Sequence, residues 1–192
     1  MLPNQGNALL NVGRAAIAHA LNLDFQCHVD ESASWLQAWG ASFVTLTQHD
    51  ELRGCIGSLE AYRPLAADIK SNAVSAALHD PRFLPLSADE FETIAIEVSI
   101  LSSTQRITAR DEADALRQIK PGIDGIVLEY GRYRSTFLPQ VWDELKQPQQ
   151  FLAMLKRKAG LPVDFWASDL KLARYTVSKW RETDAVGDCH HG

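Results

Sequence analysis

The segment Ile94–Leu101 alternates between two kinds of side chain more regularly than any other part of the chain. Isoleucine or valine occupies positions 94, 96, 98 and 100, and the positions between them carry alanine, glutamate, serine and leucine. Successive side chains of a β-strand point to opposite faces of the sheet, so this segment predicts a strand with one continuous apolar face.

Other segments combine strand composition with turn signals, or apolar residues at helical spacing with capping residues. We expect further strands at residues 41–47, 52–59, 126–130, 133–137 and 172–180. We expect helices at residues 7–21, 64–79 and 148–160. The spacing of Ser87 and Glu90 predicts a short helix that opens with a capping box, and Thr108 with Asp111 predicts a similar start for a helix that uses Ala113, Leu116 and Ile119. Hairpin signals outnumber signals of parallel crossovers, which favours an α+β fold with a largely antiparallel sheet flanked by helices over a doubly wound parallel sheet. Residues 183–192 are expected to form a disordered tail.

Composition narrows the class of protein. Apolar residues make up 46% of the 192 residues and charged residues 22%, which is typical of a globular protein and excludes a disordered or fibrous one. The longest segment without Asp, Glu, Lys or Arg, residues 32–49, contains polar residues and predicts no membrane helix. The start of the chain shows no secretory signal, so we expect a cytoplasmic location. The net charge of −5 argues against a nucleic-acid partner.

The motifs of common cofactor and metal sites are absent from the sequence. Cys27, Cys55 and Cys189 are widely spaced and form no Cys-x-x-Cys pair, so we expect reduced thiols and no zinc site. No dinucleotide loop, phosphate-binding loop, zincin motif or nucleophile elbow occurs. We therefore expect neither a bound cofactor nor a metal, and we interpret the metal-capable residues 189–191 as solvated.

One segment has a composition that is costly for a strand: Leu52-Arg53-Gly54-Cys55-Ile56-Gly57. Two glycines weaken a strand and are tolerated where the backbone bends or comes close to something else. If the segment is extended, Arg53 and Cys55 share a face, and a guanidinium near a thiol favours the reactive thiolate. Cys55 is then a candidate nucleophile. The alternative is a small buried Cys55 with glycines that serve packing, and the residues alone favour this alternative.

Titratable residues gather where the helix of residues 64–79 ends. His79 is a candidate general base toward Cys55, with Asp80 and Arg82 beside it. The alternative is a helix end, in which His79 lies near the last carbonyls, Asp80 holds the turn and Arg82 pairs with an acid. Glu97 is buried with a raised pKa if the sheet is covered on both sides, and faces solvent if one side is open, which is commoner in antiparallel sheets.

The hexapeptide matches the signature of the AMMECR family, whose prokaryotic members are called AmmeMemoRadiSam system protein A. The resemblance extends up to about residue 182. It continues through Asp80-Pro81-Arg82-Phe83, Pro85-Leu86, Ile96-Glu97-Val98-Ser99-Ile100-Leu101, Gly125-Ile126-Val127-Leu128, Phe137-Leu138-Pro139-Gln140-Val141, Lys158-Ala159-Gly160-Leu161 and Arg174-Tyr175.

The resemblance implies one α+β domain over residues 1–182, with a main lobe and a smaller second lobe, and a functional surface at the hexapeptide. It also implies an association with a Memo-like protein and a radical-SAM protein in a modification pathway whose chemistry the family does not define. The family's activity is not established, so the resemblance supports the site more than the reaction.

Three hypotheses follow. In the first, the chain is an enzyme or enzyme component with catalytic and ligand-binding residues around the hexapeptide. The catalytic candidates are Cys55, His79 and Glu97, and the ligand-binding candidates are Arg53, Gly54, Gly57, Asp80, Arg82 and Gln140. In the second, the chain is a non-catalytic scaffold that docks a Memo-like or radical-SAM partner. In the third, a cleft lined by Arg53, Arg82 and Gln140 senses an unknown small molecule.

Overall fold

The computed structural model describes residues 3–27 and 29–182. Within it the chain forms two compact units: the described residues up to 101 and from 178 onward form the first, and residues 102–177 form the second. Each unit has its own sheet and its own hydrophobic core. The fold class is α+β with antiparallel strand pairing, as the sequence predicted.

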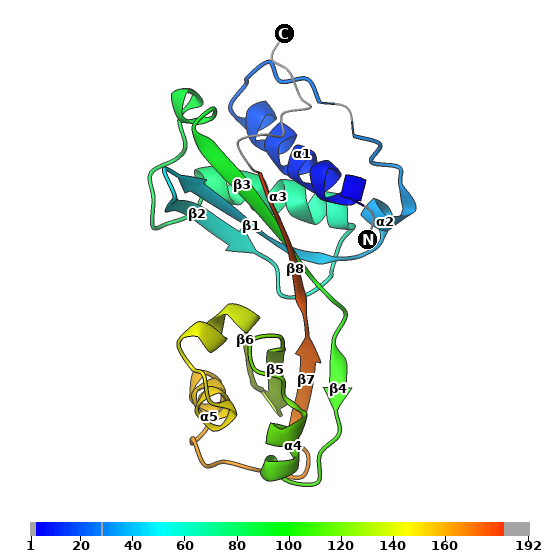
Figure 1. Ribbon diagram of the computed structural model, residues 1–192, viewed down its shortest axis with the longest axis vertical. Coiled ribbons are helices and arrows are strands. Elements are labelled where there is room, and N and C mark those ends of the chain that lie inside the picture. Colours follow the sequence, from blue (N-terminus) through cyan, green and yellow to red (C-terminus); the bar gives the residue numbers. More distant parts are fainter. Residues whose placement is uncertain (1–2, 28, 183–192) are drawn as a thin grey trace. The chain divides into compact units, whose positions relative to one another are not determined.

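The first unit contains a four-stranded sheet in the order β2-β1-β3-β8. Its strands are β2 (Glu51–Gly57), β1 (Ala41–Gln48), β3 (Ile94–Leu101) and β8 (Val177–Arg181). The helices α1 (Pro3–Ala20) and α3 (Leu65–Leu78) pack against each other over one face of this sheet (Figure 1). Two short helices, α2 (Ser34–Gln37) and the 3₁₀ helix η1 (Ala88–Glu90), lie in the connections.

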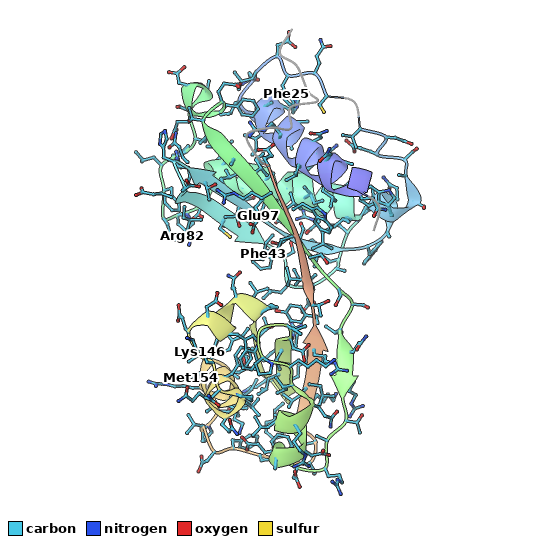
Figure 2. The ribbon with its side chains drawn as sticks, viewed as in Figure 1. Phe25, Phe43, Arg82, Glu97, Lys146 and Met154 are labelled. Atoms are coloured by element: carbon cyan, nitrogen blue, oxygen red, sulfur yellow. The ribbon has the colours of Figure 1, made fainter. Side chains whose placement is uncertain are left out.

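Alternation along the strands separates the two faces of this sheet. Val44, Leu46, Ile96 and Val98 are fully buried and point toward α1 and α3. Their neighbours in sequence form the opposite face, which we name the Cys55 face. It carries Phe43, Thr45, Thr47, Cys55, Gly57, Ala95, Glu97, Ser99 and Lys179. Phe43 and Glu97 are labelled in Figure 2.

The hairpin β1–β2 turns through His49 and Asp50, whose φ angles of 52° and 63° both lie in the left-handed region. Two such residues make a primed turn, whose twist matches that of the flanking strands. On the β2 side the pairing register shifts between Leu46 and Thr47, because Leu46 lies opposite Gly54 and Thr47 lies opposite Leu52. Arg53 is the extra residue of this β-bulge.

The second unit contains a sheet in the order β4-β7-β5-β6, with the helices α4 (Glu112–Gln118) and α5 (Pro148–Lys158) and the 3₁₀ helix η2 (Pro139–Asp143). Its strands are β4 (Gln105–Ile107), β7 (Lys171–Tyr175), β5 (Gly125–Tyr130) and β6 (Tyr133–Phe137). Ile126 and Leu128 on β5 pack with Phe151, Leu152 and Leu155 of α5, and all five are fully buried.

The single strand predicted for residues 172–180 is two strands, β7 and β8, which belong to different sheets. The break falls at Thr176, which neither glycine nor proline marks. Its carbonyl accepts a hydrogen bond from the N–H of Ser102 at 2.9 Å, and its own N–H donates to the Ser102 hydroxyl at 3.0 Å. The predicted tail, residues 183–192, lies outside the described residues. Among the described residues, no helix has the length and apolar character needed to cross a bilayer.

Candidate functional site

Four polar side chains form a row across the Cys55 face, one from each strand of the first sheet. In the strand register Cys55 lies opposite Thr45, and Thr45 lies opposite Glu97. The Thr45 hydroxyl donates to the Cys55 Sγ at 3.3 Å, and the Lys179 Nζ lies 3.7 Å from the Glu97 Oε1. Neighbouring strands are about 4.8 Å apart, so the row from Cys55 to Lys179 extends over about 14 Å.

Cys55 is a partly exposed free thiol and a member of neither hydrophobic core among the described residues. Cys55 is therefore not the small core residue that the alternative interpretation predicted. Cys27, in contrast, takes part in a disulfide, so the expectation of reduced thiols is wrong for Cys27. Among the described residues, no group of three or more His, Cys, Asp or Glu side chains could hold a metal ion.

The two glycines of the hexapeptide leave space that the protein itself fills. A Cβ atom at Gly54 would lie 2.2 Å from the Ala76 carbonyl oxygen of α3, and one at Gly57 would lie 2.2 Å from the Phe43 ring. Gly54 lets β2 approach the backbone of α3, and Gly57 accommodates the Phe43 side chain. Both glycines therefore have the packing role that the sequence left open as an alternative.

Arg53 is engaged by Glu90 rather than by Cys55. Its Nε and Nη2 donate to the two Glu90 carboxylate oxygens at 2.9 and 3.1 Å. Glu90 also accepts from the N–H and hydroxyl of Ser87, which confirms the capping box predicted for this segment. The Arg53 guanidinium and the Ser87 N–H lower the pKa of Glu90 to about 2. An anionic ligand at Arg53 would have to compete with this carboxylate.

Asp80 and Arg82 contact the backbone of Cys55. The Asp80 Oδ2 accepts from the Cys55 N–H at 2.8 Å, and the Arg82 Nη2 donates to the Cys55 carbonyl at 3.2 Å. Asp80 and Arg82 are joined by two further hydrogen bonds of 2.9 and 2.7 Å. The Arg82 side chain, together with the N–H groups of Cys55 and Arg82, holds the pKa of Asp80 well below its usual range although the carboxylate is buried. Figure 2 labels Arg82, which lies beside β2 at this edge of the sheet.

His79 and Gln140 take no part in the hydrogen bonds described for Cys55, Asp80 and Arg82. His79 is exposed at the C-cap of α3, where its N–H donates to the Ser75 carbonyl, and no hydrogen bond joins it to Cys55 among the described residues. Gln140 is exposed on η2 of the second unit, whereas Arg53 and Arg82 belong to the first. The roles assigned to His79 and Gln140 remain predictions.

The sequence patterns did not single out Thr45, Lys179 or the buried residue Asp68. Asp68 is fully buried and accepts hydrogen bonds from residues of β1, α3 and the connection between β2 and α3. The donors are Ser42, Ser58, Arg63 and Asn72. The acidic residue in the first turn of a helix is a visible signal for Asp68, but it does not distinguish a buried carboxylate from a solvated one.

Comparisons with known proteins agree with the geometry of the fold. A family model described as AMMECR1 matches residues 10–180. Protein MJ0810 of Methanocaldococcus jannaschii is 41% identical over 144 residues, which cover 72% of this chain and 70% of that protein. A protein of Aeropyrum pernix is 36% identical over 193 residues, covering 95% and 80%. The crystal structure of the uncharacterized protein PH0010 from Pyrococcus horikoshii is similar with a TM-score of 0.79 and 31% identity, over 99% of this chain and 97% of that one.

Proposed function

The chain belongs to the AMMECR1 family, and we propose that it is an enzyme or enzyme component of a covalent modification pathway in which Cys55 is the reacting group. The observation that supports this proposal is the contact of the Cys55 thiol with the Thr45 hydroxyl on a partly exposed sheet face. A hydroxyl that donates to sulfur stabilises the thiolate more than the thiol, and the thiolate is the nucleophile.

In the proposed step, Cys55 adds to a polarised double bond of the substrate. The sulfur forms a bond to the electrophilic carbon, the π-electron pair moves to the far atom of that bond, and the thiol proton passes to water, from which the Glu97 carboxylate accepts it. The register supports these roles, because Thr45 lies opposite Cys55, where its hydroxyl donates to the sulfur, and Glu97 lies on the next strand of the same face. Before this step Lys179 balances the charge of the Glu97 carboxylate, which it approaches to 3.7 Å.

The partners proposed for this pathway are a Memo-like protein and a radical-SAM protein, and the location proposed is the cytoplasm. The assignment of the partners comes from the family resemblance. The net charge of −5 is consistent with protein or small-molecule partners rather than nucleic acid.

The rate at which iodoacetamide alkylates Cys55 tests the nucleophile. The rate is measured by mass spectrometry of the peptide that contains residue 55, and Cys55→Ser serves as the blank. We expect Cys55 to react faster than glutathione at the same pH, because the thiolate is stabilised. A rate no faster than that of glutathione would remove the nucleophile from the proposal.

A second candidate function, a non-catalytic scaffold, has an observation of its own. Large apolar side chains of the first unit are exposed around the ends of β2 and in its neighbouring connections, which is typical of a protein-binding surface. They are Leu52, Leu59, Tyr62 and Leu84, which are 44%, 47%, 56% and 84% exposed.

Affinity capture of a Memo-like or radical-SAM protein separates the two functions. If Leu84→Asp abolishes capture while Cys55→Ser leaves both capture and the pathway's product unchanged, the chain is a scaffold. If Cys55→Ser abolishes the product while capture persists, the chain contributes chemistry.

A further inference from the structure

The peptide group of Cys55 lies on the outer edge of the first sheet. β2 is the terminal strand, so only one of its edges pairs with β1. The Ser58 N–H donates to the Ser42 carbonyl at 2.8 Å, and antiparallel ladders alternate between hydrogen-bonded and non-hydrogen-bonded pairs. Cys55 and Thr45 therefore form a non-hydrogen-bonded pair, in which the side chains approach closely and the backbone N–H and carbonyl of Cys55 point away from β1.

Two side chains occupy the positions that a neighbouring strand would take. The Asp80 carboxylate accepts from the Cys55 N–H at 2.8 Å, and the Arg82 guanidinium donates to the Cys55 carbonyl at 3.2 Å. One acceptor and one donor at the same residue are what an adjacent strand supplies. The pair is held together by its own hydrogen bonds of 2.9 and 2.7 Å.

We propose that the Asp80–Arg82 pair replaces a neighbouring strand at Cys55 and positions its side chain against the Thr45 hydroxyl. Asp80 and Arg82 are then positioning residues rather than ligand-binding residues. The inference deepens the proposed function and depends on it, because the position of Cys55 matters for chemistry only if Cys55 reacts.

The hydrogen bonds of Asp80 support a positioning role over a ligand-binding one. The carboxylate accepts from the Cys55 N–H, the Arg82 N–H, the Arg82 Nε and the Arg82 Nη2. Its side chain is 2% exposed, so solvent and ligands do not reach it. The strongly lowered pKa of Asp80 keeps the carboxylate ionised, and therefore an acceptor, at every pH where the protein would be assayed. Arg82 is 53% exposed and lies on the outside of this arrangement.

A double-mutant cycle between Asp80 and Thr45 tests the inference, with alkylation of Cys55 by iodoacetamide as the readout. Thr45→Val removes the donor to sulfur, and we expect it to slow alkylation about fivefold in the otherwise unchanged chain. Asp80→Ala releases the Cys55 peptide, so Thr45→Val is expected to change the rate less than about twofold in that background. Asp89→Ala, which removes an exposed carboxylate from the same connection, is the matched control and leaves the fivefold effect in place.

Amide hydrogen exchange at Cys55 gives a second readout that does not depend on reactivity. We expect exchange to be at least about tenfold faster in Asp80→Ala, because the Cys55 N–H loses its acceptor. Arg82→Ala removes the contact to the carbonyl and the side-chain hydrogen bonds to Asp80, but it keeps the Asp80 acceptor, and it serves if Asp80→Ala does not fold. It is expected to reduce the effect of Thr45→Val by about half.

The outcomes separate the inference from the proposed function. A fivefold effect of Thr45→Val that persists in the Asp80→Ala and Arg82→Ala backgrounds overturns the inference, although Cys55 is reactive. A wild-type Cys55 no faster than glutathione overturns the proposed function, and Cys55 amide exchange then decides whether Asp80 holds the peptide. Unchanged amide exchange in Asp80→Ala overturns the positioning role in either case.

Discussion

Arg53 and Glu90 face each other in a two-pronged ion pair, with Nε–Oε1 and Nη2–Oε2 distances of 2.9 and 3.1 Å. Their side chains are 14% and 27% exposed, so the pair is largely shielded from solvent. The pair joins the bulge of β2 to the capping box of η1. This contact fixes the connection that follows Asp80 and Arg82, and it therefore supports the edge of the sheet next to Cys55.

Replacing Glu90 with Gln should destabilise the protein by about 1.5 kcal/mol at neutral pH, because the shielded Arg53 charge loses its partner. The pKa of Glu90 is lowered from 4.5 to about 2, so the carboxylate stabilises the folded state above 4.5 and loses this contribution as the pH falls toward 2. The difference in unfolding free energy between the wild type and Glu90→Gln should therefore shrink across that window. Urea denaturation at a series of pH values measures it.

Glu31→Gln is the matched control for this experiment, because Glu31 pairs with Lys70 in the same unit while both side chains are 42% exposed. An exposed pair contributes little, so this substitution should cost less than about 0.5 kcal/mol. Equal costs for the two substitutions would mean that shielding of the Arg53–Glu90 pair has no effect on its strength.

Substitution by alanine should have opposite effects on stability at Gly54 and at Gly13. Alanine at Gly54 places its Cβ 2.2 Å from the Ala76 carbonyl oxygen, so β2 and α3 would have to separate, at a cost of about 3 kcal/mol. Alanine at Gly13 meets its nearest neighbours at 3.7 Å and removes a glycine from the interior of α1, which should stabilise by about 0.5 to 1 kcal/mol. Thermal and urea denaturation of the two variants check the signs, and a neutral Gly54→Ala would show that β2 does not need this close approach.

Local sequence patterns were sufficient to predict those elements whose structure is determined by neighbouring residues in the sequence. The alternation in Ile94–Leu101 defines β3, and the spacing of Ser87 and Glu90 defines the capping box at η1. The two strands at residues 171–181 were predicted as one, because the change of sheet at Thr176 depends on its hydrogen bonds to Ser102 rather than on a turn residue.

The partners of Cys55 could not be predicted, because one inserted residue changes the register. A hairpin without a bulge would pair Thr45 with Gly54. The extra residue Arg53 shifts the register of β2 by one position, so that Thr45 pairs with Cys55. The same bulge directs Arg53 to Glu90 instead of Cys55. Asp80 was recognised as part of the site, but its contact with a peptide group 25 residues away has no signature in the local sequence.

The buried carboxylate of Asp68 should be one of the most sensitive positions of the first unit. It accepts hydrogen bonds from Ser42 and Ser58 at 2.7 and 2.8 Å and from the Arg63 Nε at 2.8 Å. Asp68→Ala leaves these buried donors without their acceptor, and we expect a loss of about 3 to 5 kcal/mol. Asp24→Ala, at an exposed position of the same unit, should change the unfolding free energy by less than about 0.5 kcal/mol. A small loss for Asp68→Ala would mean that water replaces the carboxylate.

The ion pair between Lys156 and Glu112 in the second unit predicts an asymmetry between its two members. Lys156 is fully buried, and its Nζ lies 2.8 Å from the Glu112 Oε1 and 3.2 Å from the Val163 carbonyl, whereas the Glu112 side chain is 32% exposed. Glu112→Ala leaves a buried ammonium without its counter-charge and should cost about 3 kcal/mol.

Lys156→Met removes the buried charge instead, keeps the apolar stem within the core, and leaves a carboxylate that water can solvate. It should cost less than about 1 kcal/mol, and the double variant should be no less stable than Glu112→Ala alone. Urea denaturation of the three variants measures the asymmetry. If Lys156→Met destabilises the protein more than Glu112→Ala does, this asymmetry is wrong. The contact of the ammonium with the Val163 carbonyl then stabilises the fold by more than the burial of the charge destabilises it.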